Sequence, residues 1–119
     1  MRSLVVVILL VSGAGCRAKS SEGAPCGTVA GRFFTIAREE LSRATVDPAT
    51  RRAVTDQLPA MRDSLAQACV DGAWPPAIRD CLVNAATHVA FEACERQLTE
   101  AQRRVLETSV DHPQRETSP

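Results

Sequence analysis

The sequence contains no tyrosine and only four aromatic residues of other kinds in its 119 positions, Phe33, Phe34, Trp74 and Phe91. Proteins that bind single-stranded nucleic acid stack bases on aromatic side chains, so this scarcity argues against such a partner. The charge balance argues the same way, because 14 Lys and Arg residues stand against 14 Asp and Glu residues. No positive excess is available to attract nucleic acid or an anionic membrane surface. We therefore expect no nucleic-acid partner.

The common catalytic and metal-binding motifs are also missing. There is no C-x-x-C pair for redox exchange or zinc, no C-x-x-C-H for haem and no H-E-x-x-H for zinc. The two histidines, His88 and His112, have no serine or carboxylate partner in a recognisable motif, so we interpret them as surface residues. The charge doublets 39–40, 51–52 and 103–104 are typical of solvated helix faces. We expect neither an enzyme, nor a metal site, nor a cofactor.

Strand-like alternation of apolar and polar residues is absent too, which indicates an all-α fold. Apolar residues instead recur at spacings of three and four, which predicts a small bundle of four to five short helices. The first predicted helix runs from about Thr28 to Arg43. Its apolar face consists of Cys26, Ala30, Phe33, Ala37, Leu41 and Ala44.

A second predicted helix begins at Asp47-Pro48, an N-cap acceptor followed by proline, and ends at Asp71-Gly72. Its apolar face consists of Val54, Leu58, Met61, Leu65 and Ala68/Cys69. Pro59 lies inside this stretch and removes a backbone donor, so we expect the helix to kink or split near residues 55–58.

The chain then turns at Trp74-Pro75-Pro76. A third helix of about eleven residues carries Ile78, Cys81/Leu82 and Ala85, and a fourth carries Thr87, Phe91, Cys94 and Leu98. Thr99 and Gln102 have the spacing of a capping box that opens a last helix, which should fade by Val110. Trp74 has two interpretations, a cap on the core beside the cysteines or an anchor for a protein partner.

Five cysteines are present, and an odd number in an exported protein leaves one outside any set of internal disulfides. Four of them, Cys26, Cys69, Cys81 and Cys94, fall in the helical region. If the helices form hairpins, Cys26 meets Cys69 and Cys81 meets Cys94. The rival pairing, Cys69 with Cys81 and Cys26 with Cys94, can also be built. We expect two disulfides that stabilise a core of marginal size, and we favour the first pairing.

The fifth cysteine, Cys16, follows Arg2, an apolar run over residues 4–11 and the small residues 12–15. The run is too short to span a membrane and has the length of a secretory signal. The stretch resembles the signal of bacterial lipoprotein precursors, although Gly13 stands where these signals usually carry leucine. The resemblance implies that Cys16 receives lipid and becomes the mature N-terminus. Ordinary secretion, with cleavage after Gly15 or Ala18, is the alternative.

This resemblance divides the chain into a signal peptide (1–15), a lipidated cysteine with a flexible tether (16–25), a helical domain (26–110) and a polar tail (111–119). Without residues 1–15 the chain has 13 basic and 14 acidic residues. Two or three acyl chains would anchor it stably. By resemblance to enterobacterial sorting rules, Arg17 after the cysteine favours the outer membrane, with the domain facing the periplasm or the cell surface.

The segment over residues 69–102 also resembles small uncharacterised cysteine-containing lipoproteins of myxobacteria. The residues that carry the resemblance are Cys69, Trp74, Cys81, Cys94, Leu98, Thr99 and Gln102. It implies no activity. We expect a lipid-anchored cell-envelope protein that acts as a structural or interaction module. Its expected partner is another protein of the envelope. The alternative is a small-ligand or lipid-binding protein of the envelope, which would need a cavity between the helices.

Overall fold

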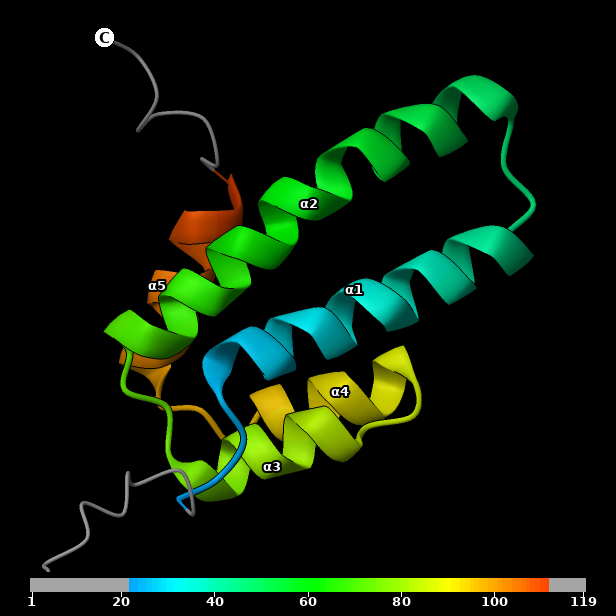
Figure 1. The fold of residues 1–119 in the computed structure, drawn as a ribbon. Coiled ribbons are helices and arrows are strands. Elements are labelled where there is room, and N and C mark those ends of the chain that lie inside the picture. Colours follow the sequence, from blue (N-terminus) through cyan, green and yellow to red (C-terminus); the bar gives the residue numbers. More distant parts are fainter. Residues whose placement is uncertain (1–21, 112–119) are drawn as a thin grey trace, which may run out of the picture.

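The structure, a computed structural model, describes residues 22–111 as five helices (Figure 1). They are α1 (Cys26–Arg43), α2 (Pro48–Asp71), α3 (Pro76–Asn84), α4 (His88–Glu95) and α5 (Glu100–Asp111). No strand occurs in this part of the chain, so the predicted all-α bundle is confirmed. The predicted signal peptide, Cys16, His112 and most of the predicted tether and tail lie outside the described residues.

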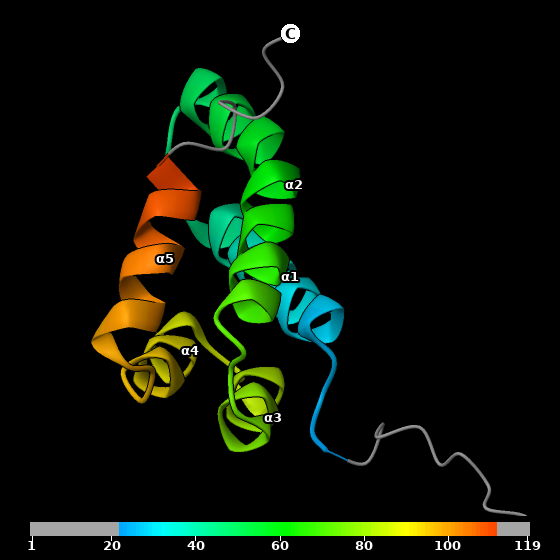
Figure 2. The same ribbon diagram turned by 90° about the vertical axis from the view of Figure 1, so that its left-hand side faces the viewer.

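The two longest helices, α1 and α2, form an antiparallel hairpin, and the other three pack against one half of it (Figures 1 and 2). Helices α3 and α4 form a second, shorter hairpin that contacts α1. Helix α5 packs along α2 on another side (Figure 2). Residues 44–47, the hairpin tip, join α1 to α2 at the end away from the start of α3 (Figure 1).

Two helices begin at the capping residues that the sequence indicates, Asp47 and Thr99, and a third begins after Thr87, which we expected on the apolar face of its helix and which is instead its N-cap. The Asp47 carboxylate accepts hydrogen bonds from the backbone N–H of Thr50 (2.9 Å) and from its hydroxyl (2.6 Å). The Thr87 hydroxyl accepts from the N–H of Ala90 at 3.2 Å. Thr99 and Gln102 form the reciprocal capping box, with bonds of 2.9 and 3.2 Å. Apart from the bond donated by the Thr50 hydroxyl, each of these bonds satisfies a backbone donor that has no partner inside its helix, so each cap stabilises a helix start.

Helix α2 is not split at Pro59, which contradicts one of the two expected outcomes there. The helix is continuous from Pro48 to Asp71 with Pro59 inside it. Both Pro59 and Thr55, the residue whose carbonyl loses its N–H partner, are exposed. Solvent can therefore bond to that carbonyl, while Leu58 and Leu65 are buried at 3% exposure and hold the helix on both sides of the proline.

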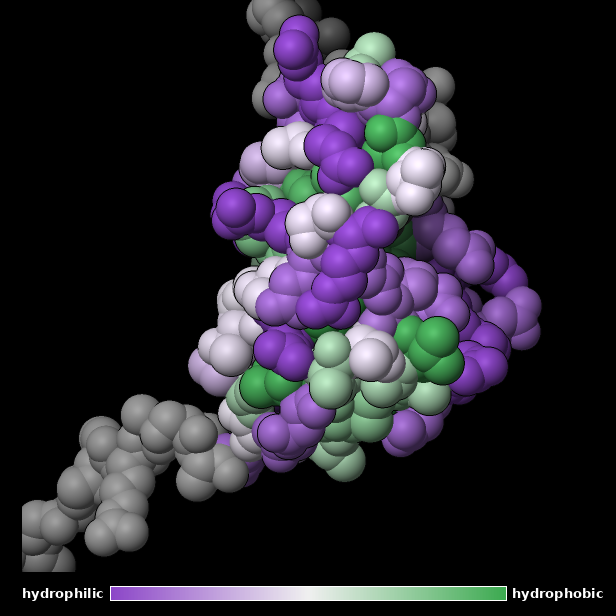
Figure 3. Space-filling model, turned by 90° about the vertical axis from the view of Figure 1, so that its right-hand side faces the viewer, coloured by the Kyte–Doolittle hydropathy of each residue, from purple (hydrophilic) through white to green (hydrophobic). Residues whose placement is uncertain are grey.

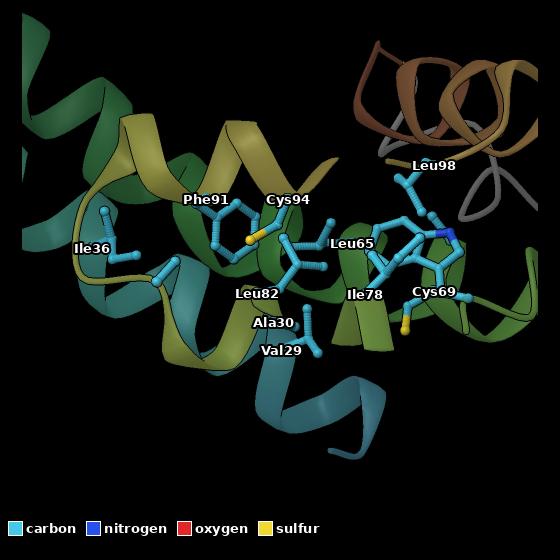
Figure 4. Close-up of a cluster of buried hydrophobic side chains, with 13 residues drawn as sticks. Val29, Ala30, Ile36, Leu65, Cys69, Ile78, Leu82, Phe91, Cys94 and Leu98 are labelled. Carbon is cyan, nitrogen blue, oxygen red and sulfur yellow. The ribbon is translucent and has the colours of Figure 1, made fainter. Parts of the chain in front are cut away.

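The core lies where α1, α3 and α4 meet the second half of α2 (Figure 4). Leu82 of α3 is fully buried, and it lies close to Val29 of α1 and Phe91 of α4 (Figure 4). Phe33 packs beside Phe91 with ring centroids 6.0 Å apart. Removing a side chain of this size from water contributes about 1.5–3 kcal/mol to folding. The remaining buried members are Ala30, Ile36, Leu65, Ala68, Cys69, Trp74, Ile78, Ala85, Cys94 and Leu98.

Two predicted helix ends differ from the structure. Helix α3 has nine residues rather than about eleven, because its C-cap, Ala85, leaves the helix to enter the core. Helix α4 ends at Glu95, before Leu98. Leu98 is nevertheless buried, since a tight turn in which its N–H donates to the Glu95 carbonyl at 2.9 Å returns it to the core. Apolar spacing therefore continued past the true end of the helix.

Candidate functional site

The four cysteines of the helical domain form two disulfides, Cys26–Cys69 and Cys81–Cys94. Their Cα atoms are 5.7 and 5.8 Å apart, a separation ordinary for a disulfide. The first joins the start of α1 to the end of α2, and the second joins α3 to α4. The favoured pairing is confirmed, and the rival pairing across Trp74 is wrong. Disulfides are compatible with an oxidising, extracytoplasmic compartment.

Trp74 is buried, with 2% of its surface exposed. Its indole lies against Gly72, where an added Cβ would come within 2.9 Å of Nε1. Gly72 therefore leaves the space that the indole occupies. The structure supports the core interpretation of Trp74. Contact with a protein partner would require an exposed ring, so the partner-binding prediction finds no support in this arrangement.

The N-terminal segment just before α1 is fastened to the start of α3, which the sequence did not indicate. The Arg79 guanidinium donates to the carbonyl of Glu22 (2.9 Å) and to that of Ala24 (2.6 Å). Its Nε donates to the carbonyl of Trp74 at 3.0 Å. The carboxylate of Asp80 accepts from the N–H of Ala24 at 2.8 Å. We call residues 22–25 with Arg79 and Asp80 the N-terminal clasp.

The backbone conformation of Gly23 brings the N-terminal segment of the clasp into close contact with the start of α3. Gly23 has φ +90° and lies so near Pro76 that a Cβ on it would sit 2.8 Å from the Pro76 Cα. A larger residue is unfavourable at this position for two reasons, because its Cβ would clash with Pro76 and because the left-handed backbone disfavours any residue with a side chain. We expected residues 16–25 to form a flexible tether, and for residues 22–25 this prediction is wrong. They are part of the folded domain.

The charged residues that the sequence singled out serve local structure. The His88 imidazole pairs with Glu92 at 2.9 Å, and both side chains are about half exposed. The backbone N–H of His88 donates to the Glu40 carboxylate at 3.3 Å. Arg51 donates to the carbonyls of Leu41 and, at 2.8 Å, of Ala44, which holds the chain around the hairpin tip. These contacts are those of surface residues that fasten helix ends.

A groove of about 250 Å³ runs between α4 and α5, just below the size range of small-ligand pockets. Leu106 is its one apolar residue, and the others are Glu92, Glu95, Arg96, Arg103 and Glu107. Burial raises the pKa of Glu95 above its ordinary value, the Glu92 carboxylate raises it further, and His88 lowers it. A second depression lies along α1 alone, over Thr35, Arg38, Glu39 and Ser42.

Within residues 22–111, no group of three or more His, Cys, Asp or Glu side chains is placed to hold a metal ion. In the same part of the chain, no helix combines the length and the apolar character needed to cross a membrane. The chain matches no protein-family model, no curated protein and no solved structure. Its own residues are therefore the basis for any functional conclusion.

Proposed function

We propose that this protein is a lipid-anchored protein of the bacterial cell envelope, in which Cys16 carries the lipid. The anchor holds a disulfide-stabilised helical domain that acts as a structural or interaction module. With Arg17 after the cysteine, the proposal places the protein in the outer membrane, with its domain toward the periplasm or the cell surface.

The observation that carries the proposal is the use of the cysteines. Four of the five are consumed by two disulfides within the domain, Cys26–Cys69 and Cys81–Cys94. The fifth, Cys16, stands directly after an apolar run and four small residues, the position of the lipid-bearing cysteine in lipoprotein precursors. Internal disulfides thus account for every cysteine except the one that the signal pattern marks for lipid.

Metabolic labelling with an alkyne fatty acid tests the anchor. The full chain is expressed in a bacterial host, and the label on the wild type is compared with that on Cys16→Ser. We expect label and membrane association in the wild type and neither in the variant. The double variant Cys81→Ser/Cys94→Ser is the control, because it also removes thiols but keeps Cys16 and the label. A wild type that is unlabelled and soluble would refute the proposal.

A further inference from the structure

The turn between α2 and α3 exposes a run of apolar residues next to the N-terminal clasp. Val70 is 62% exposed, and Ala73, Pro75, Pro76 and Ala77 are exposed as well. We call these five residues the α2–α3 corner. The clasp lies directly on it, because Gly23 contacts Pro76. The chain that leads back to Cys16 therefore departs from the surface of this corner.

The length of chain before the clasp limits how far the corner can stand from the anchor. Six residue steps separate Cys16 from Glu22. Even a fully extended chain spans at most about 20 Å over that number of residues. By comparison, the 18 residues of α1 place the hairpin tip about 27 Å from the start of that helix. The anchor thus holds the corner end of the domain close to the lipid.

The opposite end of the hairpin has a different surface. On the face turned toward the hairpin tip, hydrophilic residues predominate in the upper part, and several hydrophobic residues adjoin one another only in the lower part (Figure 3). The corner end carries the carboxylates of Glu22, Asp71 and Asp80, while the guanidinium of nearby Arg79 is bonded to backbone carbonyls. The corner itself therefore carries no positive excess that would attract anionic lipid, and the two basic residues between Cys16 and the clasp, Arg17 and Lys19, belong to the chain that carries the lipid. We expect the contact of the corner with the membrane to depend on the anchor and on the apolar side chains.

We infer that the α2–α3 corner rests on a zwitterionic phospholipid surface and that the N-terminal clasp fixes this orientation, directing the hairpin tip away from the membrane. The inference rests on the proposed lipid anchor at Cys16. Arg79 and Asp80 bind the backbone of the chain that carries the lipid to the start of α3. The domain is therefore held in one orientation relative to its anchor.

Site-specific photo-crosslinking tests the orientation on a matched pair of sites. Ala77 and Ala49 are both exposed, and both follow a proline at the start of a helix, α3 for Ala77 and α2 for Ala49. A benzophenone amino acid replaces one of them in the full lipidated chain. The protein is reconstituted into phosphatidylcholine and phosphatidylethanolamine vesicles with a headgroup-labelled tracer. We expect at least fivefold more labelled lipid on the Ala77 probe than on the Ala49 probe.

A second matched pair, Val70 at the corner and Val46 at the hairpin tip, should show the same ratio if the first substitutions disturb folding. Equal crosslinking at both ends, or more at the tip, would overturn the orientation. In the variant Arg79→Gln/Asp80→Ala, shown by circular dichroism to be folded, the ratio should fall at least twofold. An unchanged ratio there would overturn the role of the clasp.

Fatty-acid labelling of the same preparations separates the two proposals. If the wild type carries lipid on Cys16 but the probes crosslink equally, only the orientation is wrong. If no lipid is present on Cys16, both the anchor and the orientation are wrong.

Discussion

Gln102 donates a hydrogen bond of 2.8 Å from its side-chain amide to the carbonyl oxygen of Gly72, thirty residues earlier in the chain. The oxygen of the same amide accepts from the N–H of Thr99 at 2.9 Å. One side chain therefore caps α5 and also fastens it to the end of α2, beside the buried Trp74.

Replacing this side chain should destabilise the domain more than an ordinary surface change. Gln102→Ala removes both bonds, so we expect the free energy of unfolding to fall by about 1–2 kcal/mol. Gln57→Ala is the control, because Gln57 is an exposed residue of α2, and its effect should stay within about 0.5 kcal/mol. Urea denaturation followed by circular dichroism measures both. Equal effects would mean that neither bond of Gln102 contributes to stability.

The centre of the core predicts a larger effect. Leu82 is fully buried among α1, α3 and α4, so Leu82→Ala should lower the free energy of unfolding by about 2–5 kcal/mol through lost burial and a cavity. Val89→Ala, at a side chain that is 71% exposed, should change it by less than about 0.5 kcal/mol. A Leu82 variant as stable as the Val89 variant would show that the core lies elsewhere.

The two disulfides should contribute unequally. In the chain-entropy account, the Cys26–Cys69 loop, with a sequence separation of 43, contributes about 4 kcal/mol, and the Cys81–Cys94 loop, with a separation of 13, about 3 kcal/mol. We therefore expect Cys26→Ser/Cys69→Ser to lower the melting temperature more than Cys81→Ser/Cys94→Ser does. The reverse order would show that loop length does not control their effect.

Peptide mapping without reductant checks the pairing itself. Trypsin cuts after Arg79 and after Arg96, and no lysine or arginine lies between them, so Cys81 and Cys94 should leave on one internally bridged peptide. The peptides that contain Cys26 and Cys69 should be joined to each other. A bridge between the two sets would contradict the structure.

Glu95 should make stability depend on pH in a definite direction. Because burial raises the pKa of its carboxyl above the ordinary value of 4.5, the folded state binds its proton more tightly than the unfolded state does. The contribution of Glu95 to stability is thus full below about pH 4.5 and is lost as the pH rises through the raised value. Glu95→Gln should gain stability relative to the wild type at pH 7 and show little gain at pH 4.

Glu107→Gln is the matched control, since Glu107 lines the same groove but is exposed. It removes a carboxyl from the same groove, so it serves as the reference for Glu95→Gln. Urea midpoints at pH 4 and pH 7 measure the stability of both variants and of the wild type. A gain for Glu95→Gln at pH 7 no larger than that for Glu107→Gln would show that the Glu95 carboxyl is not buried in solution.

The helices and the disulfide pairing were predictable because their signals are local. Asp47 and Thr99 bond to residues three positions away, and the cysteine pairing follows once neighbouring helices fold back on each other. The effect of Pro59 was harder to foresee, because its outcome depends on whether the carbonyl of Thr55 faces solvent. The exposure of that carbonyl depends on how the helices pack, which the local sequence does not reveal.

The clasp was not predictable, since its residues lie 55 to 57 positions apart. Nothing in the composition of residues 17–25 distinguishes the part that is bonded to α3 from the part that precedes it. The one sequence feature that agrees with the clasp is Gly23, because only glycine is small enough to lie against Pro76 there. A separation of 30 positions likewise explains why the sequence indicated Gln102 only as part of a helix cap and not as a contact of Gly72.

The α1–α2 hairpin is closed by a covalent bond at one end and by weaker contacts at the other. Cys26–Cys69 joins its base, whereas no residue from 37 to 57 is buried and the bonds of Arg51 hold the loop. Opening therefore begins at the hairpin tip and proceeds toward the base, where the disulfide stops it. Backbone amides along α1 and α2 should exchange with deuterium in that order, fastest near Ala44 and slowest near Cys69.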